Sequence, residues 1–168
     1  MHLPTRPRAF LAAIDSGPKG VYQTLRIMRY FVRTGKKDML VRQKALSIIK
    51  NRPQKDFAGE VQDLHKFVRD SIRYVKDIAG VETVQTPDIT LEIGQGDCDD
   101  KSVLLASLLE SIGHPTRFVA VGFRPGHFSH VLIETKIGAR WIPLETTEPV
   151  PMGWYPPRVR ARMEVFNR

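Results

Sequence analysis

The sequence lacks the features that several protein classes require. Its single cysteine, Cys98, excludes an intrachain disulfide framework and a zinc cluster built from cysteines. No stretch approaches the roughly 20 apolar residues of a membrane-spanning helix, and there is no internal repeat or low-complexity tract. The apolar stretch at residues 9–14 is shorter than the core of a secretory signal peptide. We therefore expect cytoplasmic synthesis without a signal peptide, and no membrane span.

The chain has 168 residues, of which 42% are apolar, with twelve glycines and twelve prolines. This composition is typical of an ordinary globular protein and unlike that of disordered or fibrous chains. The length gives room for one domain with a small helical extension.

The formal net charge of +8 is distributed unevenly along the chain. Residues 1–55 have a charge balance of +11, residues 56–155 of −6 and residues 156–168 of +3. We predict that residues 1–55 form a basic helical extension packed on the core. Residues 56–155 then form the core, and residues 156–168 a basic C-terminal tail. Two interpretations remain open for the basic ends. They meet nucleic acid, an anionic surface or an acidic partner, or they are solvated or fold back on the chain's own acidic centre.

Apolar residues recur at helical spacing in the first half of the chain. This pattern predicts a basic helical hairpin over residues 19–51 and a third helix over residues 57–75, with His65 half-buried beside its apolar stripe. Residues 76–96 contain several glycines and a proline without periodicity, which predicts a loop. A buried helix then runs from Cys98 to Gly113.

Strand-like runs follow the buried helix. They cover residues 117–122, 129–135 and 140–144, and a short turn at Ile137-Gly138 predicts a β-hairpin between the last two. Helices followed by strands indicate an α+β protein with an antiparallel sheet.

Cys98 lies where a thiol can become a nucleophile. Asp97 can cap the helix, with Asp100 completing a capping box, so that Cys98 is the first helical residue. At that position the helix dipole favours the thiolate, which is the reactive form. The nearby carboxylates, including that of Asp99, raise the thiol pKa unless they point away or bind backbone N–H groups. A cation is then needed close to the sulfur, and an imidazolium is the obvious candidate.

His130 is the best candidate for the base, and Glu145 for the group that orients it. If Ile137 and Gly138 are the two turn residues, His130 lies directly opposite Glu145 across the hairpin. Cross-strand partners share a face and lie roughly 5 Å apart at Cβ. One ring nitrogen then binds Glu145 and the other faces the sulfur, as in a catalytic triad.

Other interpretations of these residues remain open. A lone cysteine at a helix start is often a small buried hydrophobic residue, and His130 and Glu145 can be purely structural. His127 is a rival base in a loop that nothing in the sequence orients, and His114 lies in a helix-ending turn and is structural. The aspartates beside Cys98 suggest a metal site, but no glycine or distal acid completes a calcium loop, so capping is the better explanation.

Three motifs in fixed order resemble those of the transglutaminase-like superfamily. They are GQGDCDDKS at 94–102, SHV at 129–131 and WIPLETT at 141–147. The run VRDSIRY at 68–74 is similar to the family's helix before the catalytic loop, and the basic hairpin with EPVPMGW at 148–154 resembles the form carried by tailed phages and prophages.

The resemblance implies a papain-like α+β core with Cys98 as nucleophile, His130 as base and Glu145 in the acid position. Superfamily members usually have aspartate at that last position, so the longer glutamate is a departure. Relatives include transglutaminases, cysteine proteases, peptide N-glycanases and inactive members, so the likeness indicates amide or acyl chemistry more than a substrate.

The first hypothesis is therefore a thiol-dependent amide hydrolase or acyl transferase acting on a protein or peptide. The backbone N–H of Cys98 and a donor such as Gln95 would meet the oxyanion, with Gly96 and Asp97 shaping the turn, and no metal or organic cofactor is implied. A structural or docking component of a phage particle, binding other phage proteins through the basic ends, is the alternative. Binding of nucleic acid is a third hypothesis that depends on charge alone.

Overall fold

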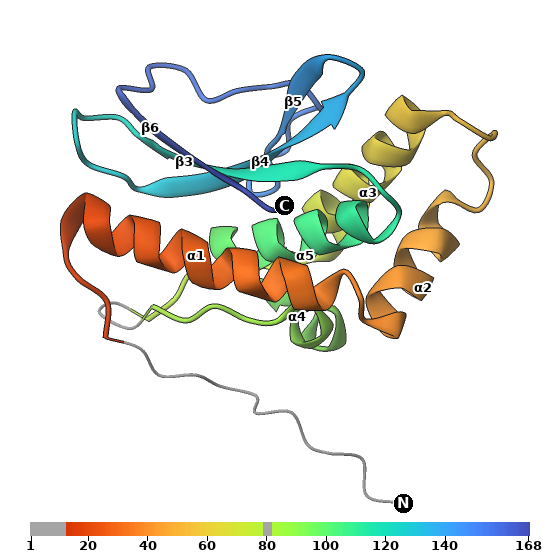
Figure 1. Cartoon of the computed structure of the whole chain (residues 1–168), viewed down its shortest axis with the longest axis horizontal. Coiled ribbons are helices and arrows are strands. Elements are labelled where there is room, and N and C mark those ends of the chain that lie inside the picture. The colour runs from red at the N-terminus through yellow and green to blue at the C-terminus, as the bar shows by residue number, and fades with distance from the viewer. Residues whose placement is uncertain (1–12, 79–81) are drawn as a thin grey trace, which may run out of the picture.

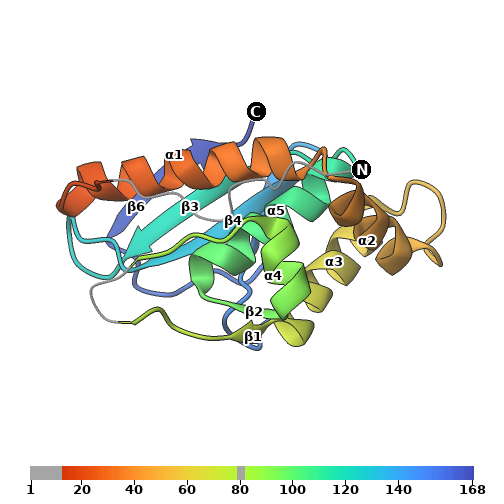
Figure 2. The same cartoon turned by 90° about the horizontal axis from the view of Figure 1, so that it is seen from below.

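The computed structural model describes residues 13–78 and 82–168, so that residues 1–12 and Gly80 of the predicted loop lie outside the described residues. An antiparallel sheet covers one side of a layer of helices (Figure 1; Figure 2). The helices are α1 (Gly17–Gly35), α2 (Met39–Ile49), α3 (Phe57–Ser71), α4 (Pro87–Ile93) and α5 (Cys98–Ser111). The strands are β1 (Arg73–Tyr74), β2 (Gln95–Gly96), β3 (Thr116–Gly122), β4 (His130–Ile137), β5 (Arg140–Leu144) and β6 (Ala161–Phe166).

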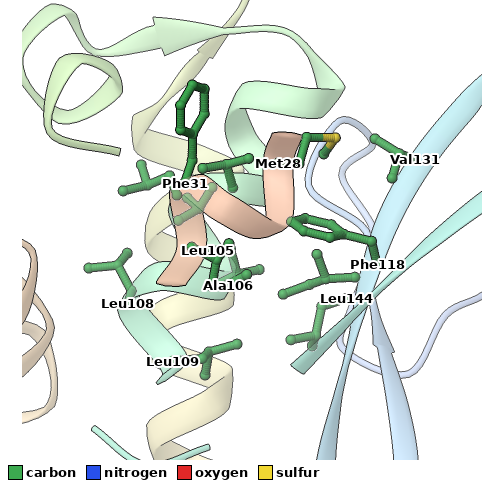
Figure 3. Packing of buried hydrophobic residues seen from close by; sticks show 14 of the residues in the cluster. Met28, Phe31, Leu105, Ala106, Leu108, Leu109, Phe118, Val131 and Leu144 are labelled. Carbon is green, nitrogen blue, oxygen red and sulfur yellow. The ribbon is translucent and has the colours of Figure 1, made fainter. Parts of the chain in front are cut away.

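Helix α5 forms the centre of the molecule. Ten consecutive residues of this helix, 100–109, are buried, so that it is enclosed around its circumference, as expected for a helix that is packed on all sides. Leu105 and Leu108 lie in one cluster with Met28 and Phe31 of α1 and with Phe118 of the sheet (Figure 3). This packing fixes the helix whose first residue is Cys98. In the described part of the chain, no helix combines the length and the apolar character needed to cross a membrane.

The basic hairpin predicted at 19–51 is formed by α1 and α2. Asp38 caps α2, its carboxylate accepting a hydrogen bond from the backbone N–H of Leu40 at 2.8 Å. Gly35 lets the end of α1 approach α4, because a Cβ at this position would lie 2.4 Å from Pro87 Cγ. The hairpin is therefore packed on the core, with Val41 and Ala45 completely buried.

The prediction that the third helix continues to residue 75 is wrong. Helix α3 ends at Ser71, and Arg73 and Tyr74 pair in parallel with Gln95 and Gly96 as the strands β1 and β2. The Nζ of Lys101 donates hydrogen bonds to the carbonyls of residues 69 and 72 at 3.3 and 2.7 Å. Carbonyls at a helix end that are satisfied by a side chain no longer need a further turn of helix.

Part of the segment predicted as loop is helical. Helix α4 begins with Pro87 in its first turn, followed by Asp88, and ends at Gly94, which has the left-handed φ of 67°. Proline at the start and glycine just past the end are ordinary helix limits. The prediction missed this helix because seven residues are too few to establish a periodicity.

The four-stranded sheet has the order β5-β4-β3-β6, and the predicted register of the β4–β5 hairpin is wrong. Ile137 pairs with Arg140, so the turn residues are Gly138 and Ala139, and Ile133 pairs with Leu144 at the end of the ladder. Gly138 takes a φ of 60° at the first turn position, as a type II′ turn requires. Ile137 is β-branched and packs on the core instead.

The segment predicted as a basic C-terminal tail contains an edge strand of the sheet. β6 pairs with β3 from Phe166 opposite Arg117 to Ala161 opposite Gly122. The sequence analysis missed this strand because polar side chains alternate along it. Two of them, Arg162 and Glu164, form ion pairs at the sheet surface. Val119, Val121 and Leu132 form a smaller apolar cluster under Tyr155 and Val159.

Candidate active site

The start of α5 has the capping arrangement that the sequence predicts. Asp97 Oδ1 accepts hydrogen bonds from the backbone N–H groups of Asp99 and Asp100 at 2.9 and 3.1 Å. The carboxylate of Asp100 in turn accepts from the N–H of Asp97 at 3.1 Å, which completes the capping box. Cys98 is therefore the first residue of the helix.

The thiol of Cys98 is half-buried and is protonated at neutral pH. Burial raises its pKa, and the negative charges of Asp99 and Asp97 raise it further, whereas a hydrogen bond from the backbone of Val131 acts in the opposite direction. Asp99 is the carboxylate that does not turn away, since its Oδ1 lies 3.7 Å from the sulfur. The condition that the sequence sets for a thiolate, carboxylates turned away from the sulfur, is therefore not met by Asp99. A nucleophilic role for this thiol would require a base to take its proton.

His130 and Glu145 are in direct contact. His130 begins β4, Glu145 follows the last residue of β5, and His130 Nε2 lies 2.5 Å from Glu145 Oε2. In the observed register Glu145 is displaced by two residues from the position opposite His130. A shift of two residues preserves the face of the sheet, and such diagonal neighbours are within reach of a long side chain. The contact therefore forms although the register that predicted it is wrong.

This contact determines which nitrogen of His130 is basic. Hydrogen bonds from His130 and Thr147 outweigh burial, so the pKa of Glu145 lies below its usual value and the carboxylate is charged. A carboxylate only accepts, so Nε2 of His130 carries the hydrogen and Nδ1 of the neutral ring keeps its lone pair. The thiol of Cys98 contacts the backbone of Val131, the next residue along β4. Within residues 13–78 and 82–168, no hydrogen bond joins the sulfur to the imidazole directly.

Two further residues hold Glu145, and no pattern in the sequence points to their role. The Nε2–H of His65 donates to the backbone carbonyl of Glu145 at 2.5 Å. The N–H and the hydroxyl of Thr147 both donate to Glu145 Oε1, at 2.7 and 2.8 Å. His65 is 1% exposed rather than half-buried as predicted, because it lies on the buried side of α3 and contacts Glu145, the residue after β5. Its separation of 80 residues from Glu145 leaves no local signal in the sequence.

Lys101 and Tyr74 complete the surroundings of the site. Burial lowers the pKa of Lys101 to about 8, and the charge of Glu145 acts against this decrease. Tyr74 is 47% exposed and pairs with Gly96, two residues before the thiol. Burial, with nearby carboxylates including that of Asp97, raises the pKa of its hydroxyl. Tyr74 therefore lies on the solvent-facing side of this site.

Comparison with known families identifies the chain. The sequence model of the transglutaminase-like superfamily matches residues 43–146, which is more than half of the chain. The chain belongs to the transglutaminase-like superfamily. No curated protein matches the sequence of this superfamily member.

Solved structures share the fold of this transglutaminase-like chain at low sequence identity. A candidate protease from Parabacteroides distasonis is 14% identical with a TM-score of 0.58, over 76% of this chain and 27% of that one. A candidate cysteine protease from Cytophaga hutchinsonii is 17% identical with a TM-score of 0.55, over 73% and 41% of the two chains. LapG from Legionella pneumophila, treated with EGTA, is 14% identical with a TM-score of 0.55, over 89% and 81%. The fold is thus the α+β fold that the motifs imply, and the chain covers less than half of the first two proteins.

The remaining predicted site residues of this superfamily member lie as follows. Gln95 and Gly96 form β2 immediately before the capping box, and a Cβ on Gly96 would lie 2.5 Å from the Cβ of Asp100. His127 is exposed in the β3–β4 loop, where its backbone forms a bridge with Arg124. His114 is buried and its Nε2 lies 2.7 Å from Glu60 Oε2, as a structural histidine would.

Asp97, Cys98 and Asp99 also have ligand atoms within 4.8 Å of one another, which is close enough for a metal ion. The Oδ1 of Asp97 is already engaged by two backbone N–H groups of α5. Capping therefore explains its position without a metal.

Proposed function

We propose that this chain is a thiol-dependent amide-bond hydrolase or acyl transferase. Cys98 is its nucleophile, His130 its base and Glu145 the group that orients the imidazole. The observation that carries the proposal is the 2.5 Å contact between His130 Nε2 and Glu145 Oε2, together with a half-buried thiol at the first residue of α5 that contacts the backbone of Val131, the residue after His130. The family match and the likeness to candidate proteases support the same class of chemistry.

The resting state supports general-base catalysis. Because the thiol of Cys98 is protonated at rest, Nδ1 of His130 takes its proton as the sulfur bonds to the substrate carbonyl carbon. The carbonyl oxygen becomes an oxyanion, which the Cys98 N–H in the first turn of α5 and a donor at Gln95 would stabilise.

Collapse of this intermediate breaks the carbon–nitrogen bond of the amide. His130 gives its proton to the leaving amine, and a thioester on Cys98 remains. Water then releases a carboxylic acid, or a second amine forms a new amide, in each case regenerating the thiol.

The test uses a fluorogenic peptide library together with iodoacetamide labelling of the thiol. Cys98→Ala should abolish turnover, and His130→Ala should lower it at least about a hundredfold, in the range of general-base contributions. Addition of a primary amine, with mass spectrometry of the product, separates hydrolysis from acyl transfer. Undiminished turnover by Cys98→Ala would overturn the proposal.

A docking role is the second candidate, and the surface of α1 favours it. Its solvent-facing side presents Tyr22 and Tyr30, 45% and 57% exposed, among the arginines Arg26, Arg29 and Arg33. Aromatic and arginine side chains on one helix face are typical of interaction surfaces. A docking role predicts that Arg26→Gln with Arg29→Gln abolishes binding to an acidic partner, measured by co-sedimentation, while Cys98→Ala does not. The reverse result would exclude this role.

A further inference from the structure

Glu145 accepts hydrogen bonds at both carboxylate oxygens and at its backbone carbonyl. Its side chain is 1% exposed, with one carboxylate oxygen bound to His130 and the other bound twice by Thr147. Its backbone carbonyl accepts a hydrogen bond from His65. Main chain and side chain are therefore fixed separately, the first from α3 and the second from the residue two positions further along the chain.

The histidine contact has a fixed donor. A carbonyl oxygen has only lone pairs to offer, so Nε2 of His65 carries the hydrogen. Burial also lowers the pKa of His65, which keeps the ring neutral. The charged or titratable groups that face the ring are Arg69 and Asp70 of its own helix and Glu145 across from it. Val61, Leu64 and Val68 are completely buried and hold α3, and with it the ring, in place.

The hydrogen bonds from His65 and Thr147 to Glu145 together form what we call the clamp. The clamp explains how a glutamate can occupy the position where superfamily members usually have aspartate. Glutamate has one more methylene group and one more rotatable bond, so its carboxylate is less well placed unless other contacts restrict it. An acid that orients an imidazole must keep its position to a fraction of an ångström. The three donors of His65 and Thr147 provide that restriction here.

We propose that His65 and Thr147 are positioning residues that fix Glu145, so that a glutamate holds the imidazole of His130 in its productive tautomer. The proposal rests on the function proposed above for Cys98 and His130. His65 and Thr147 touch neither the thiol nor the imidazole in the recorded contacts, and act through Glu145 alone.

The experiment compares two variants of His65 with a matched control. His65→Ala removes the donor, and His65→Gln replaces it with an amide N–H of similar reach. The control is His114→Ala, which removes another buried histidine whose partner, Glu60, lies away from the thiol. The readouts are the nitrogen-15 NMR signals of His130, which report its tautomer without any substrate, the rate of Cys98 alkylation against pH, and the free energy of unfolding.

We expect His65→Ala to give a mixture of His130 tautomers and to slow turnover about tenfold, mainly in kcat. His65→Gln should restore both, whereas His114→Ala should lower stability alone. Thr147→Val keeps the backbone donor, removes the hydroxyl and should give a smaller change in the same direction. This variant also tests the clamp if His65→Ala does not fold.

Two outcomes separate the clamp from the function on which it rests. Unchanged His130 tautomers and alkylation rates in both His65→Ala and Thr147→Val would overturn the clamp. Full turnover by Cys98→Ala, with the tautomers still altered in His65→Ala, would overturn the proposed function and leave Glu145 positioned for another purpose.

Discussion

Replacing Asp99 by asparagine should make Cys98 more reactive, and only above about pH 7. Asp99 Oδ1 lies 3.7 Å from the sulfur. Two unit charges at this distance repel by about 1 kcal/mol in water and about 4.5 kcal/mol at an effective dielectric constant near 20. Asp99 is half-buried rather than fully enclosed, which favours the lower end, so we expect the thiol pKa to fall by about one unit, or tenfold in thiolate. Burial raises the pKa of Asp99 itself to about 7, so the repulsion is absent in acid.

The assay is the rate of iodoacetamide alkylation of Cys98, followed by mass spectrometry from about pH 6 to about pH 9. Wild type and Asp99→Asn should react at similar rates near pH 6 and differ about tenfold near pH 8.5. Glu110→Gln is the control, because it removes a carboxylate twelve residues further along α5, about 18 Å away and beyond the screening length of about 10 Å. Equal rates for Asp99→Asn and wild type at all pH values would refute the electrostatic explanation of the protonated thiol.

Three other changes have outcomes that the structure fixes. Leu108→Ala leaves a cavity in a fully buried site and should cost about 2–5 kcal/mol in denaturant unfolding; a loss below about 1 kcal/mol would contradict the packing of α5. Gly96→Ala forces a Cβ against Asp100, 2.5 Å away, so it should break the capping box and lower both stability and alkylation of the thiol, and wild-type values of both would count against this. The lowered pKa of His65 means that the unfolded chain binds its proton more readily, so the stability it contributes is present above about pH 6.5 and decreases in acid. His65→Gln should therefore lose less stability between about pH 7.5 and pH 5.5 than wild type in the same unfolding assay, and an equal loss would refute this assignment.

The beginning of α5 could be predicted from the sequence because its determinants are local. A capping residue, its partner three positions on and a continuous apolar run are contained in about fifteen residues, and the structure has Asp97, Asp100 and Cys98 in those places. The contact between His130 and Glu145 was also accessible, since both lie near one hairpin. The register of the hairpin could not be predicted, because the choice between Ile137 and Gly138 at the first turn position depends on which of them packs on the core.

The protonation state of the thiol lay beyond the sequence. The favourable helix dipole and the unfavourable carboxylates can both be listed from it, but the distance from Asp99 to the sulfur and the burial of Cys98 decide between them. The β6 strand and the role of His65 were missed for a related reason. Each depends on a partner that is remote in the sequence. The strand β6 pairs with β3 from Arg117 onward, and His65 binds Glu145.

By itself, the sequence determined the helix that presents Cys98, the antiparallel hairpin that follows it and the family to which both belong, since capping, periodicity and motif order are properties of neighbouring residues. Only the tertiary structure decided that the thiol is protonated and that Glu145 is held from α3. Both depend on distances between segments that are remote in sequence, and the energies of charges and hydrogen bonds change steeply with those distances and with burial.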